Sequence, residues 1–205
     1  MKGFILSINK AKNEDIIVTV LTSKDIRSYY RFFGARHSIL QLGYMIDFEV
    51  DESNSNFLPR IKSISQQPFS WLFDKNRLLL WQNFITRVYL HLKDTSSLDD
   101  FYYQLLLKSA IKWQKQNPKR VLCDSYIELL DYEGRLYKDD ICFICQSPLE
   151  EDVSLMSSYK LAHPRCIYGS TISKAKLLEA LRERNTINLD DEEIEYLYLV
   201  AQKSF

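Results

Sequence analysis

Hydrophobic and polar residues alternate in the first third of the chain, and this alternation predicts β-strands. The cleanest case is residues 44–50, in which every second residue is apolar and two of the three between are acidic. A period of two is typical of a strand that buries one face. A run of β-branched residues at 16–21 predicts a strand that is buried more completely. Strands are predicted at residues 4–8, 16–21, 26–33, 44–50 and 57–64.

The five predicted strands follow one another closely within residues 1–66. No crossover helix fits between them, so the connections must be short and the strands largely antiparallel. Such a series predicts a small β-barrel. An OB-fold is the first candidate, and an SH3-like barrel is the alternative.

After Pro68 the apolar residues repeat every three to four positions, which predicts helices. Residues 72–92 carry an apolar side chain at every fourth position from Leu80 to Leu92. The Asn-Pro pair at 117–118 ends one helix and begins another, since Asn is a favoured N-cap and Pro fits the first turn. Helices are predicted at about 72–92, 98–116, 118–131, 173–184 and 190–203. Their aromatic residues are predicted to be core: Trp71, Trp81, Phe101, Trp113 and Tyr126.

The composition is that of an ordinary globular protein. Of 205 residues, 46% are hydrophobic and only five are Gly and five Pro, which argues against disordered or fibrous structure. No apolar run approaches the length of a membrane span. The chain begins directly with a predicted strand, without a targeting segment. We therefore expect a cytoplasmic protein with no membrane partner.

Two close pairs of metal-binding side chains stand out in the second half of the chain. Cys142 and Cys145 are followed, after a spacer of seventeen residues, by His163 and Cys166. Each pair can hold one edge of a tetrahedron, and thiolates with one neutral imidazole bind Zn²⁺ tightly. Because all four ligands come from the protein, no position is left for water, and the sequence predicts a structural zinc ion. The alternative is a set of ordinary buried thiols beside a loop histidine.

The remaining cysteine, Cys123, lies in an apolar helical pattern and is predicted to be a small core residue. A disulfide is not expected, because the composition and the lack of a signal peptide indicate an intracellular protein. The expected fold class is α+β. A five-stranded OB-fold barrel is expected at residues 1–67 and an α-helical domain at residues 68–205, with a zinc module inserted at about 139–170.

The predicted strand at 26–33 is the best candidate for a nucleic-acid surface, although the net charge of the chain is zero. With a period of two, Arg27, Tyr29, Arg31 and Phe33 share one face. Arginines can meet phosphates while rings stack on unpaired bases, each stack being worth about 1–3 kcal/mol. The alternative is a half-exposed strand whose rings pack on the barrel and whose arginines are only solvated. The predicted DNA-binding set is Lys24, Arg27, Tyr29, Arg31, Arg36 and His37.

The sequence carries no recognisable catalytic motif. It lacks a Gly-rich phosphate loop and a dinucleotide fingerprint, and no Ser or Cys stands in a nucleophile elbow. Adjacent acidic pairs such as Asp99 and Asp100 point in different directions on a helix, so they are poor ligands for a two-metal nuclease site. We expect no enzymatic activity. A zinc-dependent nuclease is disfavoured because four protein ligands would close the coordination sphere.

Four stretches together resemble the RecO family of bacterial recombination mediators. They are Lys2-Gly-Phe-Ile-Leu, the run from Asn13 to Thr22, Phe33-Gly-Ala-Arg-His-Ser38, and the cluster from Cys142 to Cys166. Their order and spacing carry the resemblance, which covers nearly the whole chain. His163 departs from the pattern, since zinc-bearing members commonly have Cys at that position. The chain is also shorter than many members, mostly in its helical part.

The resemblance implies a non-enzymatic DNA-repair protein in the cytoplasm, associated with the nucleoid. RecO-like proteins bind single- and double-stranded DNA, anneal complementary strands, work with RecR, contact the acidic tail of single-strand-binding protein and help to load RecA. Arg36 matches the family's basic loop arginine, and Arg27 and Arg31 lie on the corresponding barrel strand. As a hypothesis, the tail pocket lies beside a basic helical cluster: Lys108, Lys112, Lys115, Lys119 and Arg120.

The main alternative is a zinc-stabilised protein-interaction module that does not bind DNA. The Cys and His spacing also matches the first half of a LIM domain, but no second finger follows and the barrel would be unexplained. Salt dependence separates the two hypotheses. DNA binding through arginines weakens steeply as salt rises, whereas binding to an apolar peptide groove changes little.

Overall fold

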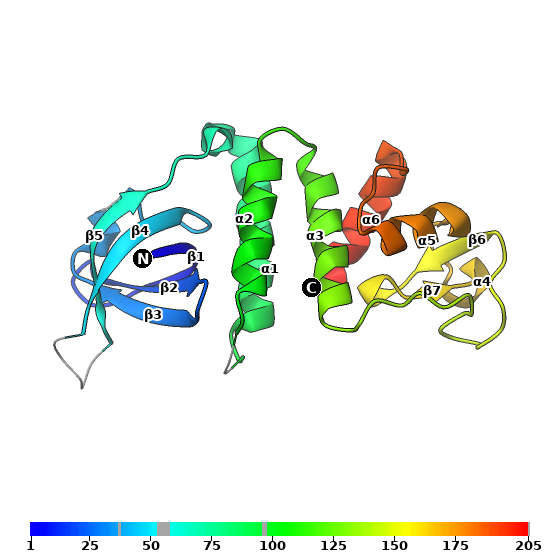
Figure 1. Cartoon of the computed structure of the whole chain (residues 1–205), viewed down its shortest axis with the longest axis horizontal. Helices are drawn as coiled ribbons and strands as arrows, with labels where there is room; N and C mark the ends of the chain where they lie inside the picture. The colour runs from blue at the N-terminus through cyan, green and yellow to red at the C-terminus, as the bar shows by residue number, and fades with distance from the viewer. Residues whose placement is uncertain (37, 53–57, 96–97, 205) are drawn as a thin grey trace. The chain divides into compact units, whose positions relative to one another are not determined.

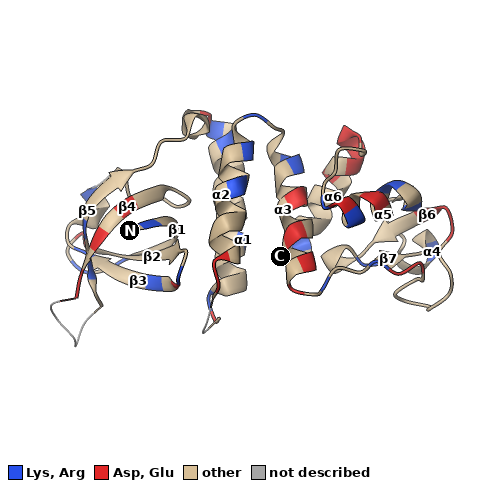
Figure 2. Ribbon diagram, in the orientation of Figure 1, with Lys and Arg blue, Asp and Glu red and all other residues tan. Residues whose placement is uncertain are grey.

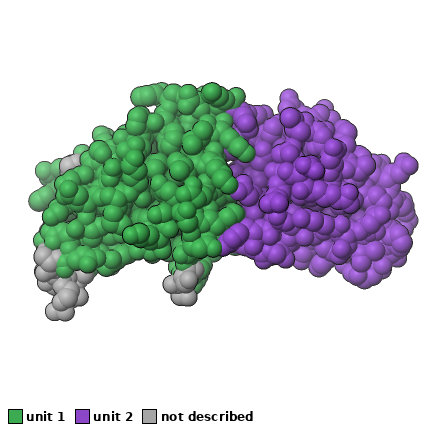
Figure 3. Space-filling model, in the orientation of Figure 1, with its two compact units in different colours: residues 1–115 green, residues 116–205 purple. Residues whose placement is uncertain are grey.

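The computed structural model describes residues 1–36, 38–52, 58–95 and 98–204 (Figure 1). The chain forms two compact units, Met1–Lys115 and Gln116–Phe205 (Figure 3). The first unit contains a β-barrel and two helices. Within the described residues, the second contains four α-helices, one 3₁₀-helix and a small sheet. The sequence predicted a domain boundary between residues 67 and 68, and that boundary stays a prediction.

Five strands close the barrel, as the sequence predicted. Around it they run in the order β1-β2-β3-β5-β4, and β4 pairs with β1 to complete the circle. The β3–β5 pair is parallel and the other pairs are antiparallel. This closed five-stranded barrel confirms the predicted OB-fold. The strands are β1 (Lys2–Lys10), β2 (Ile16–Thr22), β3 (Ile26–Arg31), β4 (Met45–Asp51) and β5 (Arg60–Gln66).

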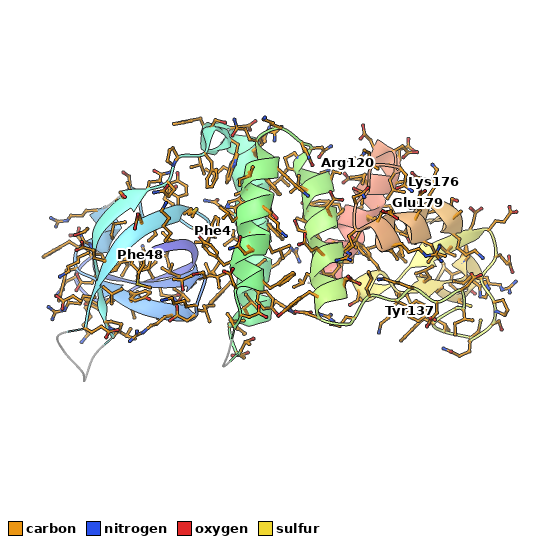
Figure 4. The ribbon with its side chains drawn as sticks, viewed as in Figure 1. Phe4, Phe48, Arg120, Tyr137, Lys176 and Glu179 are labelled. Atoms are coloured by element: carbon orange, nitrogen blue, oxygen red, sulfur yellow. The ribbon has the colours of Figure 1, made fainter. Side chains whose placement is uncertain are left out.

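The barrel interior is filled by one face of each strand. Val18 of β2 lies directly opposite Tyr29 of β3, and opposite residues of an antiparallel pair share a face. Because Val18 is fully buried, Tyr29 is also directed inside, where its ring meets the ring of Phe48 (Figure 4). The buried core comprises Ile5, Ile16, Val18, Val20, Tyr29, Leu40, Ile46, Phe48 and Ile61.

Helices α1 (Lys75–Leu92) and α2 (Phe101–Trp113) cover the outer face of β1. The Phe4 ring lies 6.1 Å from the ring of Trp81 on α1 and 5.9 Å from that of Tyr103 on α2 (Figure 4). The first half of β1, residues 3–6, is therefore buried on both faces. Trp81 also donates its indole N–H to the carbonyl of Gly43, 2.8 Å away, which ties α1 to the loop before β4.

Helix α1 begins later than predicted. Asp74 caps it by accepting hydrogen bonds from the backbone N–H groups of Asn76 and Arg77. A capped N-terminus fixes the first turn of a helix at the next residue. Residues Ser70–Phe73 form the separate 3₁₀-helix η2 instead of the first turn of α1.

The second unit is built on α3 (Pro118–Tyr132), whose N-cap is Asn117, as predicted. Arg120 of α3 donates to the carbonyl of Leu189, 3.0 Å away, and so holds the segment between α5 and α6 (Figure 4). The unit also contains a three-stranded sheet in the order β7-β6-β8. The elements that follow α3 along the chain are β6 (Asp152–Leu155), η3 (Ser157–Tyr159), β7 (Leu161–Ala162), α4 (Pro164–Ile167), β8 (Ile172–Ser173), α5 (Lys174–Glu183) and α6 (Asp191–Ser204).

The predicted core residues on the helices are buried. Cys123 and Tyr126 are fully enclosed in α3, and the three tryptophans at 71, 81 and 113 are at most 3% exposed. Phe101 is half-buried. Within the part of the chain that the structure describes, no helix is both long enough and apolar enough to span a membrane.

Candidate metal centre and nucleic-acid surface

The first pair of candidate metal ligands lies in a tight backbone turn. Cys142 donates its N–H to the carbonyl of Ser147 at 2.8 Å and accepts at its own carbonyl from the N–H of Gln146 at 2.9 Å. Gln146 has a positive φ of 59°, which lets the chain reverse directly after Cys145. Just before the turn, the ring of Tyr137 packs edge-on against Phe143, 5.8 Å away (Figure 4).

The second pair lies where β7 runs into the short helix α4. His163 is the N-cap residue and Pro164 occupies the first helical position, where its fixed φ suits a helix start. Cys166 donates its N–H to the carbonyl of His163 at 2.9 Å. Residues three apart lie on one side of a helical turn, so the imidazole and the thiol are held together.

The four ligand atoms converge, and together they form a site that could hold a metal ion. The Cys142, Cys145, His163 and Cys166 atoms all lie within 4.8 Å of one another. Nδ1 of His163 is 3.3 Å from the Cys145 sulfur and 3.9 Å from the Cys166 sulfur. Ligand atoms around tetrahedral zinc are roughly 3.4–3.8 Å apart, so small side-chain rotations would bring all four onto one ion.

The imidazole of His163 is oriented by its other nitrogen. Nε2 lies 2.9 Å from the carbonyl oxygen of Pro148, which can only accept, so Nε2 donates. This hydrogen bond is the main reason that the pKa of His163 is raised, while burial opposes the shift. It leaves Nδ1 as the ligand atom facing the sulfurs. A carbonyl partner of this kind is the usual outer support of a metal-bound histidine.

The thiols of the cluster differ in acidity. Burial would raise the pKa of Cys142, but the backbone N–H groups of Cys145, His163 and Ile144 donate to its sulfur and lower the pKa to about 6. Burial and the neighbouring thiols Cys145 and Cys142 raise the pKa of Cys166 to about 11. Without metal, Cys142 therefore loses its proton more readily than Cys166.

Apart from Tyr29, the described residues of the predicted DNA-binding set fall at or just beyond the two ends of β3. Lys24 and Arg27 lie at its beginning and are exposed. Arg31 lies at its end, where its Cγ is close to the loop residue Gly34, and Arg36 follows in the 3₁₀-helix η1 (Gly34–Arg36). At about 3.3 Å per residue, Arg27 and Arg31 are separated by roughly 13 Å along the strand.

The prediction that Tyr29 stacks on a base is wrong. Its side chain is 1% exposed and lies in the barrel core. The face chosen from the sequence is the inward face, and only its ends reach solvent. His37 lies outside the described residues. For Lys24, Arg27, Arg31 and Arg36, DNA binding stays a prediction.

Three of the arginines have acceptors within the chain. Arg27 pairs with Glu52 at 2.9 Å, and Arg36 pairs with Glu14. Arg31 donates to the carbonyl of Ile61 at 3.0 Å. The two carboxylate pairs are exposed, and exposed ion pairs contribute only about 0–1 kcal/mol.

Sequence reasoning singled out Phe33 and Arg36 at the end of β3 but missed Phe32 and Arg60, which lie beside them. Phe32 is 46% exposed and Phe33 is 52% exposed. The guanidinium of Arg60 lies over the Phe32 ring at 4.8 Å, and that of Arg36 lies over the Phe33 ring at 5.3 Å. We call these four residues the aromatic patch. Figure 2 marks the Lys and Arg residues of the barrel strands in blue.

The loop that carries Phe33 and Arg36 is fixed to the barrel. Asp15, itself only 7% exposed, accepts from the backbone N–H of Phe33 at 2.7 Å and from the hydroxyl of Tyr30. Gly34 is buried against Ile16, and a Cβ at this position would lie 2.4 Å from the Ile16 side chain. Only glycine allows so close an approach.

The basic helical cluster predicted beside a tail pocket is divided. Lys108, Lys112 and Lys115 belong to the first unit, and Lys119 and Arg120 belong to the second. Lys119 pairs with Glu195, and Arg120 holds the segment before α6. The second unit has a separate groove of about 410 Å³, lined among others by Leu155, Tyr168, Tyr196, Leu199 and Lys203.

The fold and the site define an OB-fold protein with a helical region and a Cys₃His cluster. Residues 1–72 match the family model described as RecO N terminal, which spans the barrel and η2 almost to its end. This match confirms the predicted resemblance to the RecO family over the N-terminal 72 residues. No curated protein matches the chain. The domain points to a RecO-type role in DNA repair.

Proposed function

We propose that the protein is a DNA-repair and recombination mediator that binds single- and double-stranded DNA and anneals complementary strands. The observation that carries this proposal is the RecO N-terminal domain, whose barrel bears exposed arginines beside exposed rings. We also propose that it acts without catalysing a reaction. A closed set of four protein ligands, which would leave no open position on an ion, supports this.

The ion pairs between arginine and glutamate on the barrel can be replaced by contacts between arginine and DNA. Arg27 and Arg36 each hold an exposed glutamate, and such pairs are weak and screened by salt. A phosphate can replace the glutamate at little cost, and each replacement releases counterions from the DNA. Binding would therefore be strongly salt-dependent, although the chain as a whole is neutral.

The metal in this proposal is zinc, and its role is structural. Cys142, Cys145, His163 and Cys166 would hold it, and the thiolate-rich set suits Zn²⁺ better than a hard cation. When bound, the ion would cross-link the turn after residue 141 to the start of α4. The site does not exist in the unfolded chain, so metal binding would add to the stability of the folded module.

The proposed partners are RecR, RecA and the acidic tail of single-strand-binding protein. The groove of the second unit is lined by Leu199, which is 47% exposed and offers the tail an apolar contact. Lys203, also in the lining, offers the tail a positive charge. An acidic peptide with an aromatic end fits this combination. In a titration with such a peptide, Lys203→Glu should weaken binding at least tenfold. An unchanged affinity would reject the groove as the tail site.

Strand annealing tests the proposed function as a whole. Two complementary oligonucleotides labelled as a fluorescence pair should anneal faster with the wild-type protein than without it. Arg31/Arg36/Arg60→Ala should remove most of this acceleration. No acceleration by the wild-type protein would contradict the proposal. It would favour the protein-interaction module, for which Phe143 and Ile144, 37% and 49% exposed on the metal turn, offer a contact surface.

A further inference from the structure

The aromatic patch places two neighbouring phenylalanines on the surface, where large apolar rings are unfavourable. Phe32 and Phe33 are each about half exposed, and both rings lie at the end of β3. Phe32 continues the outward register of Tyr30, whose ring it meets edge-on at 5.1 Å. The position of the Phe32 ring is thus set by the strand and by Arg60, which pairs across from Tyr30 on β5.

The Phe33 ring is held in place by a strained backbone. Phe33 has a φ of 49°, a conformation that costs a bulky residue about 1–3 kcal/mol. It is maintained by Asp15, which accepts from the Phe33 N–H at 2.7 Å, and by Gly34, which packs against Ile16. Strain that is kept at an exposed aromatic residue indicates a constraint other than core packing.

Each ring is accompanied by a cation. The guanidinium of Arg60 covers Phe32 at 4.8 Å, and that of Arg36 covers Phe33 at 5.3 Å. An apolar protein partner would have to bury these charges, which is costly unless they are paired. A nucleotide meets both groups at once, because its base can stack on the ring while its phosphate pairs with the arginine.

We propose that Phe32 and Phe33 are base-stacking residues that make this protein prefer single strands over duplex. This inference rests on the proposed DNA binding and adds to it a preference for one form of DNA. In a duplex both faces of each base are covered by its neighbours, so the rings have nothing to stack on. An unpaired strand exposes its bases, so only single-stranded DNA gains from the rings. The arginines serve both forms, since both carry phosphates.

The test compares single- and double-stranded oligonucleotides of equal length, by fluorescence anisotropy at one salt concentration. Phe32→Ala and Phe33→Ala should each lower affinity for the single strand about 5- to 150-fold, as expected for the loss of one stack. Affinity for the duplex should change less than twofold. Phe32→Tyr should restore single-strand binding. Phe73→Ala is the matched control, because Phe73 is 94% exposed in the same unit but lies in η2.

A second readout uses an inserted fluorophore. The three native tryptophans are buried, so Phe32→Trp adds the only exposed indole. Its emission should be quenched by the single strand and not by the duplex. Equal losses of both affinities in the alanine variants, or unchanged single-strand binding, would overturn the stacking role. In either case salt-dependent binding by the wild type would leave the proposed function standing. If the wild type bound neither form, both proposals would fail.

Discussion

The ring of Tyr29 packs edge-on against the ring of Phe48 inside the barrel, with 5.4 Å between the ring centroids. Tyr29 is therefore a core residue, and its removal should unfold the barrel before it alters any DNA contact. Tyr29→Ala should lower the free energy of unfolding by about 3–5 kcal/mol, measured by urea denaturation. Tyr29→Phe, which keeps the ring, should cost much less. A stable Tyr29→Ala protein that had lost single-strand binding would contradict this assignment.

The wrong prediction for Tyr29 shows that the sequence of a strand does not by itself determine which face points outward. Both faces of the strand at residues 26–33 carry aromatic side chains, because Tyr29 and Tyr30 are adjacent, as are Phe32 and Phe33. Either face could be the outer one from local pattern alone. The choice is made by pairing with β2, where Val18 lies opposite Tyr29, and that register is a long-range property.

Gly34 should be essential to the loop that carries the aromatic patch. A Cβ at this position would lie 2.4 Å from the Ile16 side chain, so Gly34→Ala should force the loop away from β2. We expect about 1–3 kcal/mol of lost stability by thermal or urea unfolding, as for other overpacked sites. Gly169→Ala is the control, since a Cβ there would be at ordinary contact distance, 3.5 Å. Equal stability of the two variants would contradict the packing argument.

Metal binding should be coupled to the stability of the second unit. Cys142→Ser should lower the zinc content, measured by atomic emission, and should lower the midpoint of thermal unfolding. The effect of Cys142→Ser on DNA affinity should be smaller than its effect on the zinc content or on the unfolding midpoint. Cys123→Ala is the matched control, because Cys123 is buried in α3 and should leave the zinc content unchanged. A Cys142→Ser protein that kept one zinc per chain and full thermal stability would show that this residue is not a ligand.

Zinc uptake should release protons, and Cys166 should be one source of them near neutral pH. Its pKa is raised to about 11, so it must lose a proton to bind, whereas Cys142, with a pKa lowered to about 6, is already a thiolate at pH 7. As pH falls below about 6, protons compete at Cys142 as well, and zinc affinity should fall more steeply. An indicator dye should record this release when zinc is added to metal-free protein. Cys166→Ser should reduce the release, and an unchanged release would contradict the assignment.

The ligand cluster was predictable from the sequence, whereas only Phe33 and Arg36 of the aromatic patch were. Each ligand pair is held by local geometry, a turn after Cys142 and one helical turn after His163, so spacing alone predicts which atoms meet. The patch joins the end of β3 to Arg60, which is distant along the chain and lies beside Tyr30 only through the parallel β3–β5 pairing. Helix ends were predicted where a cap is local, as at Asn117, and missed where a 3₁₀ turn intervenes before Asp74.

The central claim is that the barrel binds DNA through the arginines at the ends of β3 and in the loop that follows. Single-strand binding by fluorescence anisotropy across a salt series tests it most directly. Each arginine that meets one phosphate contributes about 0.7 to the slope of log affinity against log salt.

Arg27/Arg31/Arg36→Ala should therefore lose both affinity and roughly 2 units of that slope. Lys108/Lys112/Lys115→Ala, which removes three charges from the helical part of the same unit, should keep the slope of the wild type. If the two triple variants bound alike, the DNA path would lie off the barrel strand and the account would be wrong.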